Sequence, residues 1–256
     1  MELTEKHVEG LKELLYKMAD DQLIIGHRNS EWTGLGPILE EDIAFSSMAQ
    51  DKIGQSYALF ELLNGLGENE PDIVAFTRNS NQFHNCQLVE FPIGEYDFSL
   101  VRHFYFDHAE ALRFEALMDS SFEPLSMIAR KYKGEIKYHT LHADSWLKIL
   151  AKGTEESFTR IQNNINEFFP HALGIFEQGD YEKELIEADI FIGEDALRSR
   201  WYEKISGLLT SFGYTVPALD SVTPIYGGRK GVHTPSLQPL LDEMTEVFSI
   251  DPTAEW

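Results

Sequence analysis

Residues 43–57, with the sequence IAFSSMAQDKIGQSY, decide which fold we expect for the whole chain. Apolar side chains recur here at steps of three and four residues, which is the spacing of one face of an α-helix. That face comprises Phe45, Met48, Lys52, Gln55, Leu59 and Leu62. The predicted helix therefore turns an amine and an amide toward the core, where apolar side chains or metal ligands are expected.

Lys52 is the residue on this face that most needs an explanation. Burying an ammonium group costs free energy unless a carboxylate pairs with it, so the pattern predicts an acid on a neighbouring helix, and Asp107 is the candidate. The alternative is that Lys52 lies at the edge of the stripe and extends its ammonium to water, as lysines commonly do. This helix taken alone favours the alternative.

The composition limits the function classes that are open to the chain. Its 256 residues include 43 acidic and 21 basic side chains, a formal charge of -22, so phosphate backbones and anionic membranes should be repelled. Neither a signal peptide nor an apolar stretch of about 20 residues is visible. Cys86 is the single cysteine, which excludes an internal disulfide and a cysteine-based zinc site. We expect a soluble, cytoplasmic protein without nucleic-acid or membrane partners.

Helical periodicity with capping signals, and the lack of strand-like alternation, predict an all-α protein. Between the second and third predicted helices, residues 68–96 are rich in Pro, Gly, Asn and Ser and predict a long crossover. It should contain a helical piece at 72–76 and an extended piece at 86–91. The predicted helices are 4–26, 37–63, 97–119, 124–152, one from 154 with a kink at Pro170, 180–193, 195–212 and 234–248.

The third and fourth predicted helices each have one polar residue on an otherwise apolar inward face. In the third helix it is Asp107, between Phe104 and Phe114, and in the fourth it is His139, which follows Ile136. A lone histidine in such a place is more often a hydrogen-bonded core residue than a metal ligand.

Two helical hairpins joined by one long crossover are typical of ferritin-like bundles. We therefore expect one domain over residues 1–256, with a four-helix core at about 4–153 and additional C-terminal helices and a tail at 154–256. In the di-metal members of this class the order along the chain is an acid, Glu-x-x-His, a second acid and a second Glu-x-x-His, and these side chains enclose two metal ions.

Seven segments spread over nearly the whole chain carry a joint resemblance to a known family. They are LIIGHRNSEW at 23–32, DKIGQ at 51–55, AFTR at 75–78, YFDHAEAL at 105–112, EIKYH at 135–139, WLKILAKGT at 146–154 and GGRKGVHTPSLQPLLDEM at 227–244. With these segments the sequence resembles the C subunits of the bacterial multicomponent phenylacetyl-CoA 1,2-epoxidase, the ring-oxygenating complex of phenylacetate degradation.

The resemblance implies a bundle whose metal site has decayed, because the C subunit is a paralogue of the di-iron oxygenase, the A subunit. The six ligand positions carried over from the family pattern are Leu23, Lys52, Gln55, Asp107, Ile136 and His139. Two of them keep ligand chemistry, too few to hold two divalent ions. We therefore expect neither catalytic residues nor a metal here.

The same register places Lys52 and Asp107 together at the centre of the bundle, where a lysine at the edge of the stripe would not lie. A buried ion pair between them, with Gln55 and His139 as hydrogen-bonding neighbours, should then replace the metal site.

The function that the resemblance implies is a non-catalytic subunit that pairs with the A subunit, stabilises it and shapes its access to phenylacetyl-CoA. The complex would insert one oxygen atom of O₂ into the aromatic ring, with di-iron in the A subunit and NADPH, FAD and iron-sulfur centres in a separate reductase. None of these cofactors has a binding motif in this chain. Whether the chain forms a homo-oligomer when alone stays open.

An alternative from the enzyme class is an independent ferritin-like di-metal oxidase with an irregular site. Asp107 and Glu110 lie three residues apart, and Glu135 and His139 lie four apart, so four ligands could share a shifted site. Against it, Glu110 and Glu135 are more simply interpreted as solvated flanks of their helices in so acidic a protein.

Further polar residues are open to two interpretations each. His27, Arg28, Glu31 and Trp32 could form a contact with another subunit, which the resemblance favours, or a loop that hydrogen-bonds to itself. His103 and His108 are expected at the surface or an interface. The basic residues Arg229 and Lys230, with His233, could bind an acidic partner surface or cap the terminal helix.

Overall fold

The computed structural model describes residues 3–252 of the chain, and all regular secondary structure within that range is helical. The all-α, ferritin-like fold class is thereby confirmed. No helix in the described range is long and apolar enough to cross a membrane.

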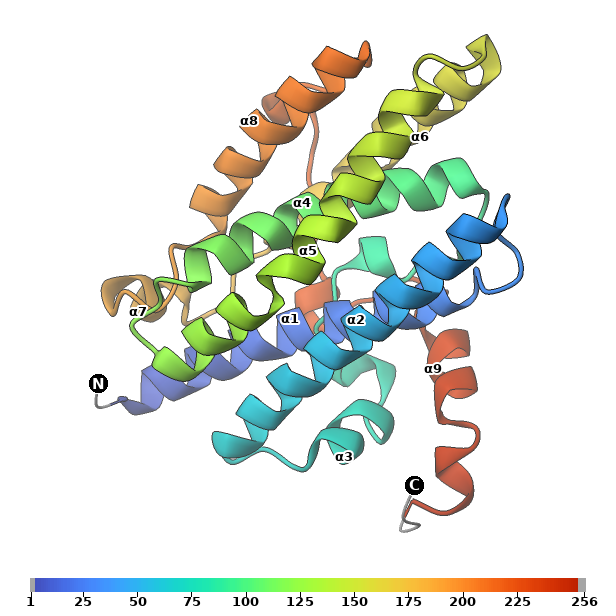
Figure 1. Ribbon diagram of the computed structural model, residues 1–256. Coiled ribbons are helices and arrows are strands. Elements are labelled where there is room, and N and C mark those ends of the chain that lie inside the picture. Colours follow the sequence, from blue (N-terminus) through green and yellow to red (C-terminus); the bar gives the residue numbers. More distant parts are fainter. Residues whose placement is uncertain (1–2, 253–256) are drawn as a thin grey trace.

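Two antiparallel helical hairpins form the bundle (Figure 1). The first hairpin consists of α1 (Glu5–Ser30) and α2 (Leu39–Gly65), and the second of α4 (Tyr96–Leu117) and α5 (Glu123–Leu150). The crossover between them contains α3 (Pro71–Phe76) and two 3₁₀ turns, Ser80–Gln82 and Gln87–Val89. The expected connection of two hairpins by one long crossover is therefore present.

The C-terminal part wraps the second hairpin and the crossover. Its α-helices are α6 (Glu155–Leu173), α7 (Glu182–Glu187), α8 (Glu194–Phe212) and α9 (Leu237–Thr245), and its 3₁₀ turns are Gly174–Phe176, Leu219–Ser221, Gly228–Lys230 and Phe248–Ile250. Figure 1 shows α6 and α8 beside the α4–α5 hairpin, with α9 below it near α3. Tyr105 Oη, on α4, donates to Ile165 O of α6, and Trp201 Nε1, on α8, donates to Tyr105 O. α4 is thus covered on several sides.

Several predicted boundaries need correction. The first helix runs to Ser30 instead of ending near Gly26. Gly26 does not end the helix; it lies where α1 packs closely against α2, since a Cβ there would lie 2.9 Å from Ile53 Cδ1. The piece expected to be extended at 86–91 contains a 3₁₀ turn. Pro170, where a kink is predicted, lies inside α6, which ends at Leu173. The pieces predicted at 180–193 and 234–248 are shorter than expected, at α7 and α9.

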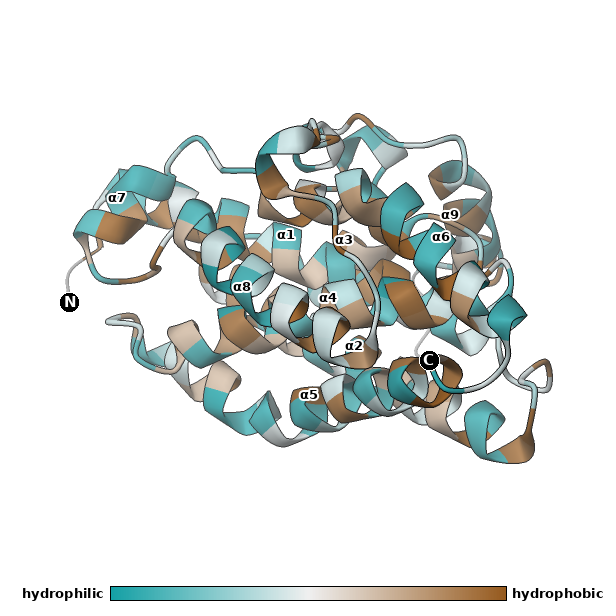
Figure 2. Ribbon diagram, turned by 90° about the horizontal axis from the view of Figure 1, so that it is seen from above, coloured by the Kyte–Doolittle hydropathy of each residue, from teal (hydrophilic) through white to brown (hydrophobic). Residues whose placement is uncertain are grey.

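The core lies between the inward faces that the periodicity predicts. Leu23, Phe114 and Ile136 are all buried, as are Phe45 and Met48. Figure 2, seen from above, shows brown hydrophobic and teal hydrophilic stretches alternating along the helices. The predicted inward stripes of the four bundle helices are confirmed at these positions.

Buried charges attach the C-terminal segment to the first hairpin. Arg229 is 6% exposed, and its Nη2 lies 2.8 Å from Asp21 Oδ2 while Nη1 donates to His84 O at 2.9 Å. His233 Nδ1 lies 2.6 Å from Glu90 Oε1. The interpretation of these two residues as a surface that binds an acidic partner is therefore wrong, since both are used inside the fold; only Lys230, paired with Asp180, is exposed.

This attachment leads to a prediction about stability. Arg229→Met should lower the free energy of unfolding by about 3–5 kcal/mol, because it leaves the buried carboxylate of Asp21 without its cation. The adjacent Lys230→Met, which removes an exposed ion pair, should change it by less than about 1 kcal/mol. Urea unfolding of both variants measures the difference, and equal effects would contradict the assignment.

Candidate functional site

The centre of the bundle holds an ion pair between the two hairpins. Lys52 comes from α2 and Asp107 from α4, with 2.7 Å between Lys52 Nζ and Asp107 Oδ1, and both side chains are 0% exposed. The Lys52 ammonium also lies 4.8 Å from the centroid of the Phe106 ring, a cation–π distance. The structure thus places the lysine and the aspartate of the two inward stripes in direct contact.

His103 is the second partner of Asp107. It lies one helical turn earlier on α4, fully buried, with its Nδ1 2.8 Å from Asp107 Oδ2 and its Nε2 2.7 Å from Asn29 Oδ1. The expectation that His103 and His108 lie at the surface is wrong for both: His108 is 1% exposed and its Nε2 lies 2.8 Å from Asp144 Oδ1. The four-residue spacing of His103 and Asp107 was a signal for their contact.

The pKa values of this cluster follow from burial and from the charges that oppose it. Burial acts to raise the pKa of Asp107, but the Lys52 ammonium and His103 outweigh it and hold this pKa well below its usual value. Burial lowers the pKa of His103 to about 4, although Asp107 acts to raise it. At neutral pH the cluster therefore contains an ammonium, a carboxylate and a neutral imidazole.

The neutral imidazole determines the direction of its hydrogen bonds. Its Nδ1–H donates to Asp107, which leaves a lone pair at Nε2 that needs a donor. The side-chain amide of Asn29 supplies that donor when its N–H₂ group faces the ring, and within residues 3–252 the Asn29 amide nitrogen has no other partner. The cluster Lys52–Asp107–His103–Asn29 is then joined by hydrogen bonds throughout.

Gln55 and His139 are buried nearby but bond elsewhere. Gln55 Nε2 donates to Glu135 Oε2 at 2.9 Å, and His139 Nε2 lies 3.0 Å from Asp51 Oδ2. The expectation that they supply hydrogen bonds around the ion pair is therefore wrong. Both contacts connect α2 to α5, so these two residues bind the hairpins together beside the central cluster.

The four ligands of the alternative oxidase site are not brought together. Glu110 is buried, not a solvated flank as expected, and it is bound by Arg113 and by Gln22 Nε2 at 2.8 Å. Glu135 is half-buried and accepts from Gln55. In the described range no group of three or more His, Cys, Asp or Glu side chains is placed to hold a metal ion. The donor set does not fit a di-iron centre.

A second polar cluster, which the sequence analysis missed, surrounds Glu41 at one end of the bundle. Its carboxylate accepts from Tyr96 Oη at 2.5 Å, His142 Nε2 at 2.7 Å and Trp146 Nε1 at 2.7 Å. Burial acts to raise the pKa of Glu41, and the bonds from His142 and Tyr96 nevertheless hold it below its usual value. Three helices, α2, α4 and α5, meet at this carboxylate.

Residues 27–32, expected to contact another subunit, bond mainly within the chain. Arg28 donates to Glu90 O and pairs with Glu31, and Trp32 Nε1 donates to Ser99 Oγ at 3.0 Å. Arg28 and Trp32 are buried. The other interpretation, a segment that hydrogen-bonds to its own fold, describes these two side chains.

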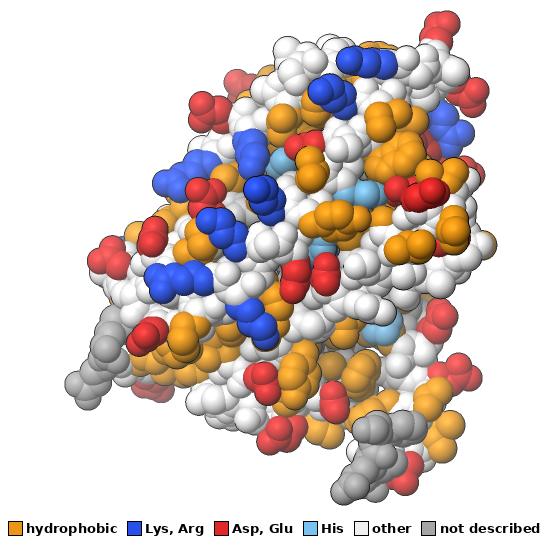
Figure 3. Space-filling view, viewed as in Figure 1, with side chains coloured by type: hydrophobic (Ala, Val, Ile, Leu, Met, Phe, Trp, Pro, Cys, Tyr) orange, Lys and Arg blue, Asp and Glu red, His pale blue; other side chains and the backbone are white. Residues whose placement is uncertain are grey.

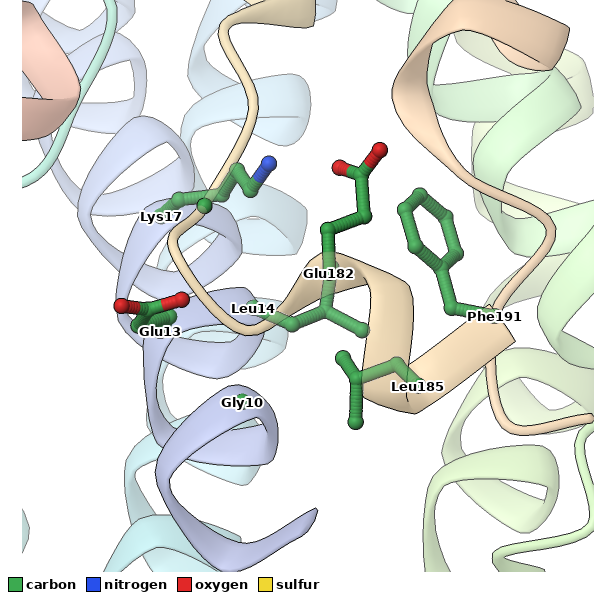
Figure 4. A pocket seen from close by; sticks show the side chains of 8 residues that line it. Gly10, Glu13, Leu14, Lys17, Glu182, Leu185 and Phe191 are labelled. Carbon is green, nitrogen blue, oxygen red and sulfur yellow. The ribbon is translucent and has the colours of Figure 1, made fainter. Parts of the chain in front are cut away.

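The hollow between α1 and α7 is too small for a ligand. Figure 4 shows Glu182 and Phe191 at this hollow, opposite Lys17 and Leu14 of α1. Its cavity volume is about 10 Å³, which is room for one water molecule at most.

Single and double substitutions at the central pair should differ in a characteristic way. Lys52→Met and Asp107→Leu should each lower the free energy of unfolding by about 3–5 kcal/mol, because each leaves one buried charge alone. The double variant should be closer to the wild type than the sum of the two. Urea unfolding measures all four proteins, and additive effects would show that the two charges do not interact.

The imidazole at the centre gives a pH-dependent prediction. The pKa of His103 is about 4 in the folded protein and near 6.5 in the unfolded chain, so the unfolded chain binds more protons between these values. The contribution of His103 to stability is therefore complete above about pH 6.5 and falls as the pH drops toward 4. The stability difference between wild type and His103→Gln, measured by urea unfolding across this range, should decrease on acidification. A pH-independent difference would exclude a neutral buried His103.

Known proteins resemble this chain over nearly its whole length. The family model described as phenylacetic acid catabolic protein matches residues 1–256. The C subunit of the 1,2-phenylacetyl-CoA epoxidase of Escherichia coli (strain K12) is 30% identical over 241 residues, which cover 94% of this chain and 96% of that protein. The resemblance expected from the seven sequence segments is confirmed. The chain belongs to the family of phenylacetic acid catabolic proteins.

Proposed function

We propose that this chain is a non-catalytic subunit of a phenylacetyl-CoA ring 1,2-epoxidase complex, in which it pairs with the di-iron A subunit and stabilises it. The observation that carries this proposal is the buried Lys52–Asp107 pair, which lies at two of the positions where the family pattern has metal ligands. The likeness to the C subunit of the Escherichia coli enzyme supports the same role.

The chemistry of the centre argues against a metal in this chain. A ferritin-like di-metal site needs four carboxylates and two histidines from four helices. Here the corresponding positions hold two apolar residues, one amide, one lysine, one aspartate and one histidine. Asp107 is already neutralised by the Lys52 ammonium, and a fixed positive charge repels any cation that would enter.

The cofactors of the reaction are assigned to the other subunits in this proposal. The di-iron centre, at which one oxygen atom of O₂ enters the aromatic ring, lies in the A subunit. A separate reductase holds FAD and iron-sulfur centres and takes electrons from NADPH. The contribution of this chain is to hold the A subunit in its active shape and to limit access to phenylacetyl-CoA.

Co-expression with the A subunit tests the proposal. The two chains should elute together at micromolar concentration, since paralogous bundles in obligate pairs bury large, apolar interfaces. The A subunit should unfold at a higher temperature in the pair than alone. With reductase, NADPH and O₂, only mixtures that contain the A subunit should convert phenylacetyl-CoA.

Metal analysis of the chain purified alone provides the control. Iron and manganese should remain far below one ion per chain, and His139→Ala should not change that content. Near-stoichiometric metal that is lost in His139→Ala, or separate elution of the two subunits, would overturn the proposal.

A further inference from the structure

The outer surface of α5 differs in charge from the rest of the molecule. Of the 21 basic and 43 acidic residues of the chain, five basic and three acidic ones lie in Glu123–Leu150. This helix is therefore net positive in a chain whose formal charge is -22. Figure 3 shows blue basic side chains and orange hydrophobic ones intermixed over the visible face of the molecule, which is the face of Figure 1 where α2 and α5 lie in front.

Most of the exposed basic residues that make no ion pair within residues 3–252 lie on α5, five of eight. Within residues 3–252, the side chains of Lys133, Lys137 and Lys148 make no ion pair, although all three are exposed. In contrast, Lys6 pairs with Glu184 and Lys12 with Glu68. The unpaired positive charge of this acidic protein is therefore concentrated on α5, where it is free to meet carboxylates of another molecule.

Exposed apolar side chains accompany these lysines. On α5 the exposed apolar residues are Met127 and Leu141, which are 56% and 60% exposed. They are separated from Arg130, Lys137 and Lys148 by three, four or seven residues, so all five lie on one side of the helix, which we call the basic ridge. The neighbouring α2 adds Leu39 and Ile43, 69% and 62% exposed. We name the exposed side chains of the two helices the α2–α5 face.

The size of this face fits a protein partner. Ten residues of α2 and twelve of α5 are exposed, and a stable interface uses about 20–30 residues on each side. From Arg130 to Lys148 the basic ridge spans about 27 Å of helix, too long for one small anion. A groove of about 240 Å³ runs along the flank of α5. It is lined by the basic residue Lys204 and by apolar residues that include Phe114 and Ile136.

We infer that the α2–α5 face docks the catalytic partner subunit, through a surface of that subunit on which carboxylates surround apolar side chains. This inference rests on the proposed function. Apolar contacts supply the affinity, and the unpaired lysines orient the partner and speed its approach. A second copy of the chain has the same charge of -22, and long-range repulsion opposes its approach.

Charge reversal on the ridge tests the electrostatic part. Lys137→Glu/Lys148→Glu should raise the dissociation constant for the A subunit by about tenfold or more, slow association, and weaken its dependence on salt. The matched control Lys183→Glu/Arg200→Glu makes the same change of net charge at exposed positions on α7 and α8. It should change the dissociation constant less than about twofold. Biosensor kinetics at low and high salt measure both.

An apolar pair of variants tests the rest of the face. Leu141→Glu on α5 should weaken binding by about tenfold or more, whereas Ile186→Glu, an exposed apolar residue of α7, should leave it near the wild-type value. Circular dichroism and thermal unfolding check that all four variants keep the wild-type fold.

The outcomes separate this inference from the proposed function. If the wild-type chain does not bind the A subunit at all, the proposed function fails. If it binds and the α2–α5 variants bind equally well, the proposed function stands and the docking inference is overturned. The inference also fails if the variants lose only self-association, or only binding to phosphatidylglycerol vesicles, with affinity for the A subunit unchanged.

Discussion

The contact between Lys52 and Asp107 is the constraint on which the bundle depends, because it joins the two hairpins where no water reaches. In such a place either charge alone would cost several kcal/mol, while the pair with its hydrogen bonds is tolerated. A slide of α2 along α4 by one helical turn, about 5.4 Å, would separate the two charges by more than an ion-pair distance. The pair therefore fixes the register between the hairpins, which apolar contacts alone fix less sharply.

The same rule of charge balance explains how the C-terminal helices attach. Glu194 at the start of α8 is fully buried and receives Lys17 from α1 at 2.5 Å and Arg113 from α4 at 2.8 Å. Arg113 also binds Glu110, one turn earlier on α4. Buried carboxylates and cations thus alternate along one connected network, whereas within residues 3–252 the exposed Lys133, Lys137 and Lys148 of α5 have no such partners. In this network the buried charges are compensated within the fold, whereas those three lysines on the α2–α5 face are not.

The sequence predicted the elements better than it predicted the contacts. Periodicity located the four bundle helices and turned Lys52 and Asp107 inward, because one apolar face per helix is a local property. It failed on α4, where His103 and Glu110, seven residues apart, are buried on one side of the helix and His108 is buried on another. A helix covered on several sides has no solvent face, so polar residues outside the apolar stripe need not be exposed.

Contacts between distant segments were not predictable from local patterns. Arg229 meets Asp21 across 208 residues, and the basic cluster at 229–233 gave no sign that it would be buried. The role of Glu41 was not predicted, because an acid in the first turn of a helix is ordinarily explained by the helix dipole. Its partners Tyr96, His142 and Trp146 are aromatic residues from two other helices. Such clusters become visible only when the helices are placed in space.

Charge balance also accounts for which residues occupy the positions that the sequence resemblance aligns with carboxylate metal ligands. In the family pattern four carboxylates compensate the charge of two metal ions, so losing the metals while keeping the carboxylates would bury four negative charges without a counterion. At those four positions this chain has Leu23, Lys52, Asp107 and Ile136, whose formal charges sum to zero. Burial acts to raise the pKa of the remaining carboxylate, Asp107, but the Lys52 ammonium and His103 hold it well below its usual value. The two buried charges at the centre of the bundle therefore balance each other without a further counterion.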